Sequence, residues 1–267
     1  MEHLIDLSKD RPRLKVALFD FDGTLSTLRY GWERIMEPLM IEMIAGETPA
    51  DEALVREVRE YINESVGIQT IYQMQWLVAA VQRHGRNPGM PSDPWWYKNE
   101  YNKRLMNPVA KRTASIQAGA KRREAFLVKD SEAFLKALRG AGVAIFVASG
   151  TDHPDVTREA AVLGLDGYFT EIAGAPVGRA DCSKEAVLKK LVAQHHLEGP
   201  EVIVIGDGKV EIALGRAVGA ITLGVASDED KLEGVNPAKR ERLIRAGAHA
   251  IVGDYQELET IFQWLQL

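Results

Sequence analysis

Five short apolar runs, rich in valine, isoleucine and phenylalanine, constrain the fold of this chain more than any other feature. They span residues 15–19, 143–148, 202–205, 220–225 and 248–252. Each run is nearly continuous rather than alternating, which is typical of strands covered on both faces. Helical patterns lie between the later runs, at residues 131–139, 154–163, 183–195 and 210–218. Because strands and helices alternate, the sequence predicts an α/β fold built on a parallel sheet flanked by helices.

The segment between residues 28 and 121 interrupts this alternation. It contains amphipathic helical patterns at residues 31–45, 51–65 and 70–83, followed by a loop-like stretch at residues 87–94. It shows no strand alternation. We therefore expect an all-helical cap domain at residues 28–121. It is inserted into an α/β core that is formed by residues 1–27 and 122–267.

Composition narrows the class of protein. The chain has 267 residues, of which 46% are hydrophobic and 27% charged, as in ordinary soluble proteins. A net charge of −5 gives no electrostatic footprint for nucleic acid, and no apolar run is long enough to cross a bilayer. The basic clusters at residues 121–123 and 239–242 are expected on solvated helix faces. The single cysteine, Cys182, suits a reducing compartment, so we expect a cytoplasmic protein with neither membrane nor nucleic-acid partners.

Polar residues follow three of the apolar runs, where ligands bind in open α/β sheets. The first run ends in Asp20-Phe21-Asp22-Gly23-Thr24, the second in Ser149-Gly150-Thr151, and the third in Gly206-Asp207-Gly208. Glu211 follows one helical turn later, and Lys184 lies at the start of a predicted helix. These patterns place carboxylates, a hydroxyl and a lysine near one edge of the sheet.

Together these four motifs resemble the haloacid dehalogenase-like superfamily. The order is that of the family: Asp20-x-Asp22-Gly23-Thr24, then Ser149, then Lys184, then Gly206-Asp207 with an acid at position 211. The resemblance covers residues 13–27 and 125–260, and the helical segment matches the position of the family's caps. It implies a doubly wound, Rossmann-like core and a hydrolase of phosphoric monoesters that depends on Mg²⁺.

The resemblance also implies roles for these residues. Asp20 is expected to attack phosphorus and form an aspartyl-phosphate, and Asp22 to protonate the leaving oxygen and then activate water. Asp20, the backbone carbonyl of Asp22, and Asp207 are expected to hold the metal ion. The phosphate is expected to be bound by Gly23, Thr24, Ser149, Gly150 and Lys184.

Other assignments stay open at this point. Glu211 stands where the family more often has aspartate, so it could reach the metal through water or orient Lys184. Arg29 and Tyr30 follow the first motif closely and are candidates for substrate specificity, with Arg29 the candidate to bind a second anionic group. Within the family, the acid at Asp22 favours phosphatases and phosphomutases over dehalogenases and phosphonatases. The lack of a histidine at residues 26–32, where mutase relatives tend to carry one, favours a phosphatase that acts on a small metabolite. A phosphomutase and a non-hydrolytic phospholigand-binding protein remain alternatives, and neither the substrate nor the oligomeric state follows from the sequence.

Overall fold

The computed structural model describes residues 1–7, 10–180 and 184–267. Within these residues the strands form one sheet in the order β1-β7-β6-β5-β2-β3-β4, and every neighbouring pair is parallel except the β1–β7 pair. The strands are β1 (Glu2–His3), β2 (Val16–Phe19), β3 (Ala144–Asp152), β4 (Glu171–Ala175), β5 (Val202–Gly206), β6 (Ile221–Val225) and β7 (Ala250–Val252). The predicted α/β class is confirmed.

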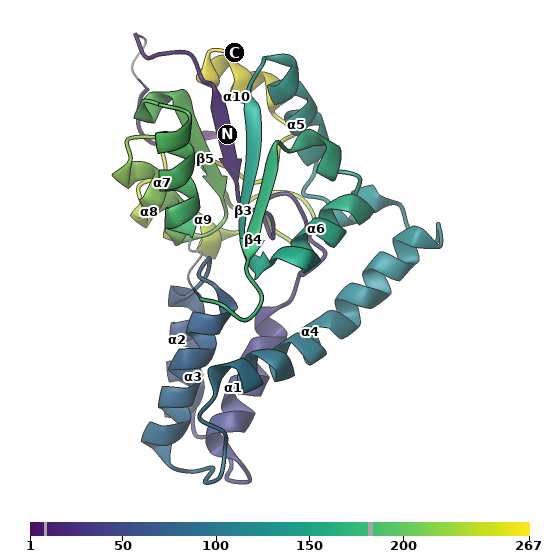
Figure 1. Ribbon diagram of the computed structural model, residues 1–267, viewed down its shortest axis with the longest axis vertical. Helices are drawn as coiled ribbons and strands as arrows, with labels where there is room; N and C mark the ends of the chain where they lie inside the picture. Colours follow the sequence, from purple (N-terminus) through teal and green to yellow (C-terminus); the bar gives the residue numbers. More distant parts are fainter. Residues whose placement is uncertain (8–9, 181–183) are drawn as a thin grey trace.

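Helices cover both faces of the sheet (Figure 1). Because alternate side chains of a strand point to opposite faces, Phe19 of β2 packs in the core cluster that includes α5 and α6, while Leu18 packs in the cluster that includes α7. The core helices are α5 (Ser131–Gly140), α6 (His153–Val162), α7 (Lys184–Gln194), α8 (Lys209–Ala217), α9 (Pro237–Arg245) and α10 (Leu258–Leu265). Cys182 and the first residue of the predicted helix at 183–195 lie outside the described residues.

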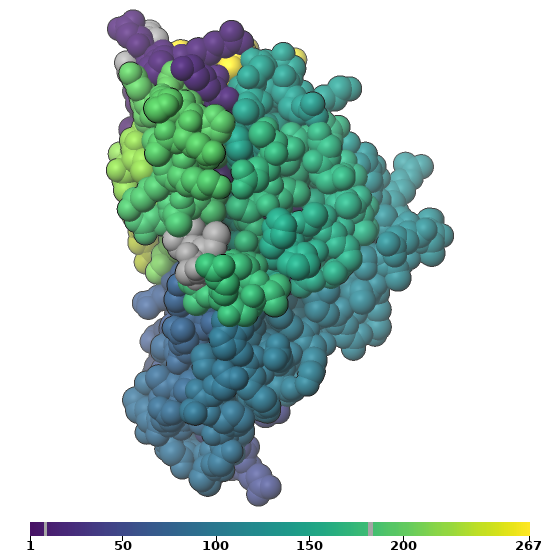
Figure 2. All heavy atoms as spheres, in the orientation of Figure 1, coloured from purple at the N-terminus to yellow at the C-terminus, as the bar shows by residue number. Residues whose placement is uncertain are grey.

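Four helices between β2 and β3 extend from one end of the sheet (Figure 1). They are α1 (Glu33–Ala45), α2 (Glu52–Glu64), α3 (Thr70–His84) and α4 (Pro94–Gln117). These helices bury an apolar cluster of their own, which is separate from the clusters of the sheet. Figure 2 shows their atoms packed directly against the carboxyl-end side of the core, so the cap and the core meet where the predicted site residues lie.

Helix α4 starts where the sequence reads as a loop. Asp93 accepts a hydrogen bond from the backbone N–H of Trp95, and Pro94 occupies the first turn, where it lacks only an N–H that has no partner in the helix. The expected loop at residues 87–94 therefore ends in a helix start. None of the described helices combines the length and the apolar character needed to cross a membrane.

Candidate active site

The sheet reverses its strand order on either side of β2, with β3 on one side and β5 on the other. This is the position at which ligands bind in open α/β sheets. A cavity of about 100 Å³ lies there, between the carboxyl ends of these strands and the cap. Its core-side lining includes Asp20, Asp22, Ser149, Lys184 and Asp207. The structure therefore brings together the residues that the motifs predicted.

Asp20 and Lys184 form a buried ion pair at the base of the cavity. Lys184 Nζ lies 2.8 Å from Asp20 Oδ1 and also contacts the carboxylate of Glu211. Burial raises the pKa of Asp20 well above its ordinary value, the charges of Glu211 and Asp207 add to this effect, and Lys184 opposes it. Burial alone would lower the pKa of Lys184, but the neighbouring Asp20 and Glu211 outweigh it and raise the pKa. The ammonium group is therefore fixed beside the carboxylate of Asp20.

Glu211 contacts the lysine, which is one of its two predicted roles. Its Oε1 pairs with Lys184, while Oε2 is buried without a hydrogen-bond partner among the described residues. The cap loop closes over this carboxylate, because a Cβ on Gly67 would lie 2.9 Å from Glu211 Oε1. Gly67 also has φ +92°, in the left-handed region that favours glycine. The loop can therefore approach the carboxylate this closely only with glycine at this position.

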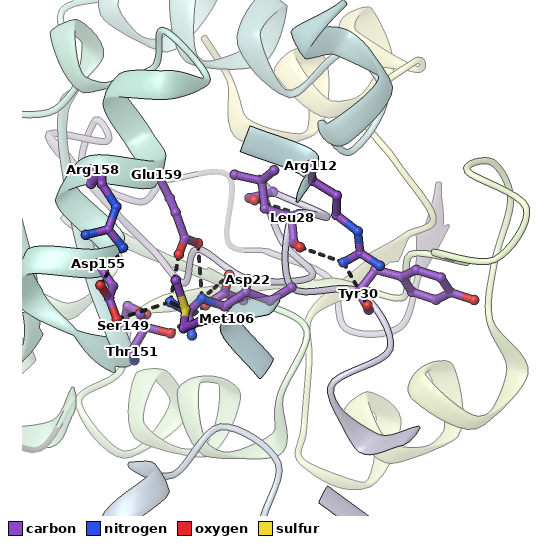
Figure 3. A network of polar contacts seen from close by, with 12 residues as sticks. Asp22, Leu28, Tyr30, Met106, Arg112, Ser149, Thr151, Asp155, Arg158 and Glu159 are labelled. Carbon is purple, nitrogen blue, oxygen red and sulfur yellow. Dashed lines mark hydrogen bonds and ion pairs between the residues drawn. The ribbon is translucent and has the colours of Figure 1, made fainter. Parts of the chain in front are cut away.

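Asp22 is held by one hydrogen bond and one long ionic contact. Thr151 Oγ1 donates to Asp22 Oδ2 at 2.8 Å, and Arg29 Nε lies 3.9 Å from Oδ1 (Figure 3). Oδ1 is buried and has no hydrogen-bond partner within the described residues. Burial raises the pKa of Asp22, against the opposing charge of Arg29. A carboxyl group that lines a cavity and has a raised pKa is suited to exchange a proton with a ligand.

Of the predicted phosphate-binding residues, Gly23, Ser149, Gly150 and Lys184 line the cavity, whereas Thr24 is fully buried and does not line it. Ser149 is buried, and its Oγ accepts a hydrogen bond from the backbone N–H of Thr151 at 3.1 Å. Gly150 lies against the cap, since a Cβ there would be 3.0 Å from the carbonyl oxygen of Ile68. The N–H of Gly23 donates to Ser26 O, and the N–H of Thr24 lies 3.4 Å from Phe21 O.

Arg29 also lines the cavity, but its guanidinium is bound to a core helix. Its Nε and Nη2 donate to the two carboxylate oxygens of Glu159 at 3.0 and 2.7 Å, and Asp155 lies 3.6 Å away. Glu159 is 0% exposed, and burial raises its pKa to about 6. Tyr30 does not line the cavity; its ring lies beneath the guanidinium groups of Arg34 and Arg112.

A second lysine, Lys239, lies beside the predicted site residue Asp207. The basic cluster at residues 239–242 was expected on a solvated helix face, and for Lys239 this expectation is wrong. Its Nζ lies 2.8 Å from Asp207 Oδ2, 2.6 Å from Glu229 Oε1 and 3.1 Å from Ser227 Oγ. Ser227 in turn donates to the carbonyl oxygen of Gly23. A helix-starting Asn-Pro before Lys239 was a signal that this residue lies in the first turn, close to the loops of the sheet edge.

The oxygen donors fit a hard divalent cation such as Mg²⁺. Asp20, Asp22 and Asp207 line one cavity and offer carboxylate and backbone carbonyl oxygens. Mg²⁺ is typically held by one or two carboxylates, with water and substrate oxygens completing its shell. Among the described residues, no three acidic, histidine or cysteine side chains are grouped so that they could hold a metal ion. The ammonium group of Lys239 is paired with Asp207 and Glu229, so these carboxylates already attract a cation.

The fold and the cavity define a capped α/β protein with an acid-lysine site at its topological switch point. A family model for haloacid dehalogenase-like hydrolases matches residues 14–219, and the chain belongs to that family. No curated protein sequence matches the chain.

Solved structures with the same fold include both phosphatases and mutases. A predicted phosphoglycolate phosphatase from Haemophilus somnus 129pt is 17% identical and aligns with a TM-score of 0.64, over 94% of this chain and 99% of its own. A β-phosphoglucomutase from Clostridium difficile is 15% identical and aligns with a TM-score of 0.63, over 95% and 97%. At these identities the likeness establishes the fold alone.

Proposed function

We propose that this chain is a phosphatase that hydrolyses a small phosphorylated molecule through a phosphoryl group on Asp20. The observation that supports this most is the meeting of Asp20, Asp22, Lys184 and Asp207 in one buried cavity. Each residue has the chemistry that one part of the reaction requires. A nucleophile, a proton donor, a fixed cation and a second carboxylate lie within reach of a single phosphate group.

In the first half-reaction, a carboxylate oxygen of Asp20 forms a bond to phosphorus as the bond to the ester oxygen breaks. Asp22 gives its proton to the departing oxygen, which leaves as an alcohol. In the second half-reaction, Asp22 accepts a proton from water, and the water oxygen attacks phosphorus. The Asp20 carboxylate is released together with inorganic phosphate.

Lys184 and the neighbouring groups stabilise the charge that is transferred. The ammonium of Lys184 is fixed beside Asp20, so it needs no reorganisation when the phosphate arrives. We propose that Ser149 and Gly150 bind the phosphate oxygens. The N–H of Gly23 donates to Ser26 O and Thr24 is fully buried outside the cavity lining, so neither is placed to do so in this structure. Mg²⁺, held by Asp20, the carbonyl of Asp22, and Asp207, would supply positive charge that screens the two anions from each other.

The residues that the cap contributes favour hydrolysis over phosphoryl transfer within a sugar. A mutase of this family generally takes extra acid–base help from its cap. Beyond Arg29, the described cap residues that line the cavity include neither histidine nor carboxylate; they are Trp32, Val66, Gly67, Ile68, Thr70, Gln73, Tyr101 and Leu105. Water is therefore the acceptor that we propose.

The test is phosphate release from a panel of phosphorylated metabolites, with Mg²⁺ and with EDTA. We expect metal-dependent release from one chemical group of compounds, and loss of that release in Asp20→Asn with an unchanged circular dichroism spectrum. Asp166→Asn, which changes an exposed aspartate, is the matched control and should keep full activity. Isomerised phosphosugar without free phosphate would show a mutase, and full activity of Asp20→Asn would overturn the proposal.

A further inference from the structure

The part of the cavity beyond Asp22 is where the leaving group of a phosphate ester would lie. Asp22 lines the cavity, and apart from Arg29 the cap closes it with apolar or neutral side chains. They belong to Trp32, Val66, Ile68, Thr70, Gln73, Tyr101 and Leu105. The whole cavity has a volume of about 100 Å³, well below the roughly 300–1,000 Å³ of pockets that bind drug-sized ligands. The leaving group therefore has little room and a mostly apolar environment.

The charges that line the cavity do not favour a second anion. Arg29 and Lys184 are its basic residues among those that the structure describes, and both are already paired. Lys184 lies between Asp20 and Glu211 at the phosphate end. The described acids of the lining are Asp20, Asp22, Asp207 and Glu229. An anionic leaving group would meet these carboxylates without an unpaired cation.

Arg29 is the basic residue that lies 3.9 Å from Asp22, and Glu159 neutralises its charge. The hydrogen bonds from Arg29 Nε and Nη2 to the two carboxylate oxygens of Glu159 are 3.0 and 2.7 Å long, and the Glu159 side chain is 1% exposed (Figure 3). A ligand carboxylate that captured the guanidinium would leave the Glu159 charge buried beside Asp155, which is strongly unfavourable. The arginine is therefore committed to the protein rather than to a ligand.

We propose that the cavity selects phosphate monoesters of small uncharged alcohols and discriminates against esters with a second anionic group close to the phosphate. This inference rests on the proposed phosphatase function. It also changes the role expected for Arg29 from the sequence. Paired with Glu159 and close to Asp22, the arginine shapes a leaving-group site that accepts neutral groups.

The experiment compares kcat/KM for pairs of compounds in which one member has a carboxylate where the other has a neutral hydroxymethyl group. The first pair is 2-phosphoglycolate and 2-hydroxyethyl phosphate, and the second is 3-phosphoglycerate and glycerol phosphate. We expect the neutral member of each pair to be favoured by about tenfold or more, since each factor of ten in rate needs only a modest difference in transition-state binding. Equal rates, or faster release from the acids, would overturn this inference while leaving the phosphatase function intact. No release from any compound of this comparison or of the metabolite panel would overturn both.

A variant separates the contribution of the ion pair from that of cavity size. Glu159→Gln keeps the shape of the side chain but removes the charge that neutralises Arg29. We expect the preference for neutral esters to shrink several-fold in this variant, because the guanidinium gains an unbalanced charge. Glu132→Gln, in the Arg123–Glu132 pair away from the cavity, should leave the preference unchanged. An unchanged preference in Glu159→Gln would contradict the role of the pair, and if that variant does not fold, the wild-type comparison decides the proposal alone.

Discussion

The buried ion pair between Arg29 and Glu159 gives a prediction whose size follows from the structure. Arg29 is 8% exposed and Glu159 is 0% exposed, so Arg29→Met leaves a carboxylate in the interior without its partner. Breaking a buried pair by removing one member typically costs about 3–5 kcal/mol of unfolding free energy. For a chain of this size the cost corresponds to a melting temperature that is lower by about 10 °C.

The cost should also depend on pH. Burial already raises the pKa of Glu159 to about 6, and the charge of Arg29 is what opposes this rise. Without Arg29 the folded pKa lies higher still, further above the value in the unfolded chain. A group with a raised folded pKa stabilises the fold at low pH and loses that contribution as pH rises through the folded pKa. The deficit of Arg29→Met relative to wild type should therefore grow between pH 6 and pH 8.

Urea unfolding followed by circular dichroism at both pH values measures this cost. The double variant Arg29→Met/Glu159→Met removes both charges, so its cost should be well below the sum of the two single variants. Arg59→Met is the matched control, because its pair with Glu37 is exposed and should contribute less than about 1 kcal/mol. If Arg29→Met loses no more unfolding free energy than Arg59→Met, the buried pair does not stabilise the fold as expected. The same follows if the losses of the two single variants add up to the loss of the double variant.

Three further predictions concern groups around the site and in the core. Lys239→Met leaves Asp207 without its ion pair, so it should lower the free energy of unfolding in EDTA by about 3 kcal/mol, and added Mg²⁺ should stabilise this variant more than wild type in thermal melts. Burial lowers the pKa of His249 to about 4, so the unfolded chain binds the extra proton as pH falls from 6.5 to 4. In urea titrations, wild type should lose about 2 kcal/mol more than His249→Asn over that window. Gly67→Ala places a Cβ 2.9 Å from Glu211 at φ +92°, so the strained loop should move away from Glu211 and lower kcat/KM by about tenfold and the melting temperature by about 3 °C; unchanged kcat/KM would contradict this role.

Residues that form local patterns could be predicted from the sequence. The five apolar runs all became strands, because strands buried on both faces need continuous apolar sequence. Strand β4 was missed because Glu171–Ala175 lies at the sheet edge, is mostly half-exposed and contains a glycine. Strand β1, with two residues, offers no periodicity at all.

Some residues of the site could likewise be predicted from local sequence patterns, and others could not. Asp20, Asp22 and Asp207 follow buried strands directly, so their convergence follows from the parallel topology once the strands are known. The pairing of Arg29 with Glu159 joins positions 130 residues apart, and no spacing in a single sequence reveals it. The Asn-Pro before Lys239 marks a helix start, but it does not show that the packing of α9 against the sheet edge buries this lysine beside Asp207.

The proposed transfer of the phosphoryl group to Asp20 is tested most directly by locating that group on the protein. The enzyme is mixed with its best substrate in Mg²⁺, quenched in acid within the first turnover, digested, and mapped by mass spectrometry. We predict a phosphorylated peptide that contains Asp20, formed and lost at rates that match turnover, and absent in Asp20→Asn. Phosphate release at the wild-type rate with no phosphorylated peptide, or with the group on another residue, would contradict the account.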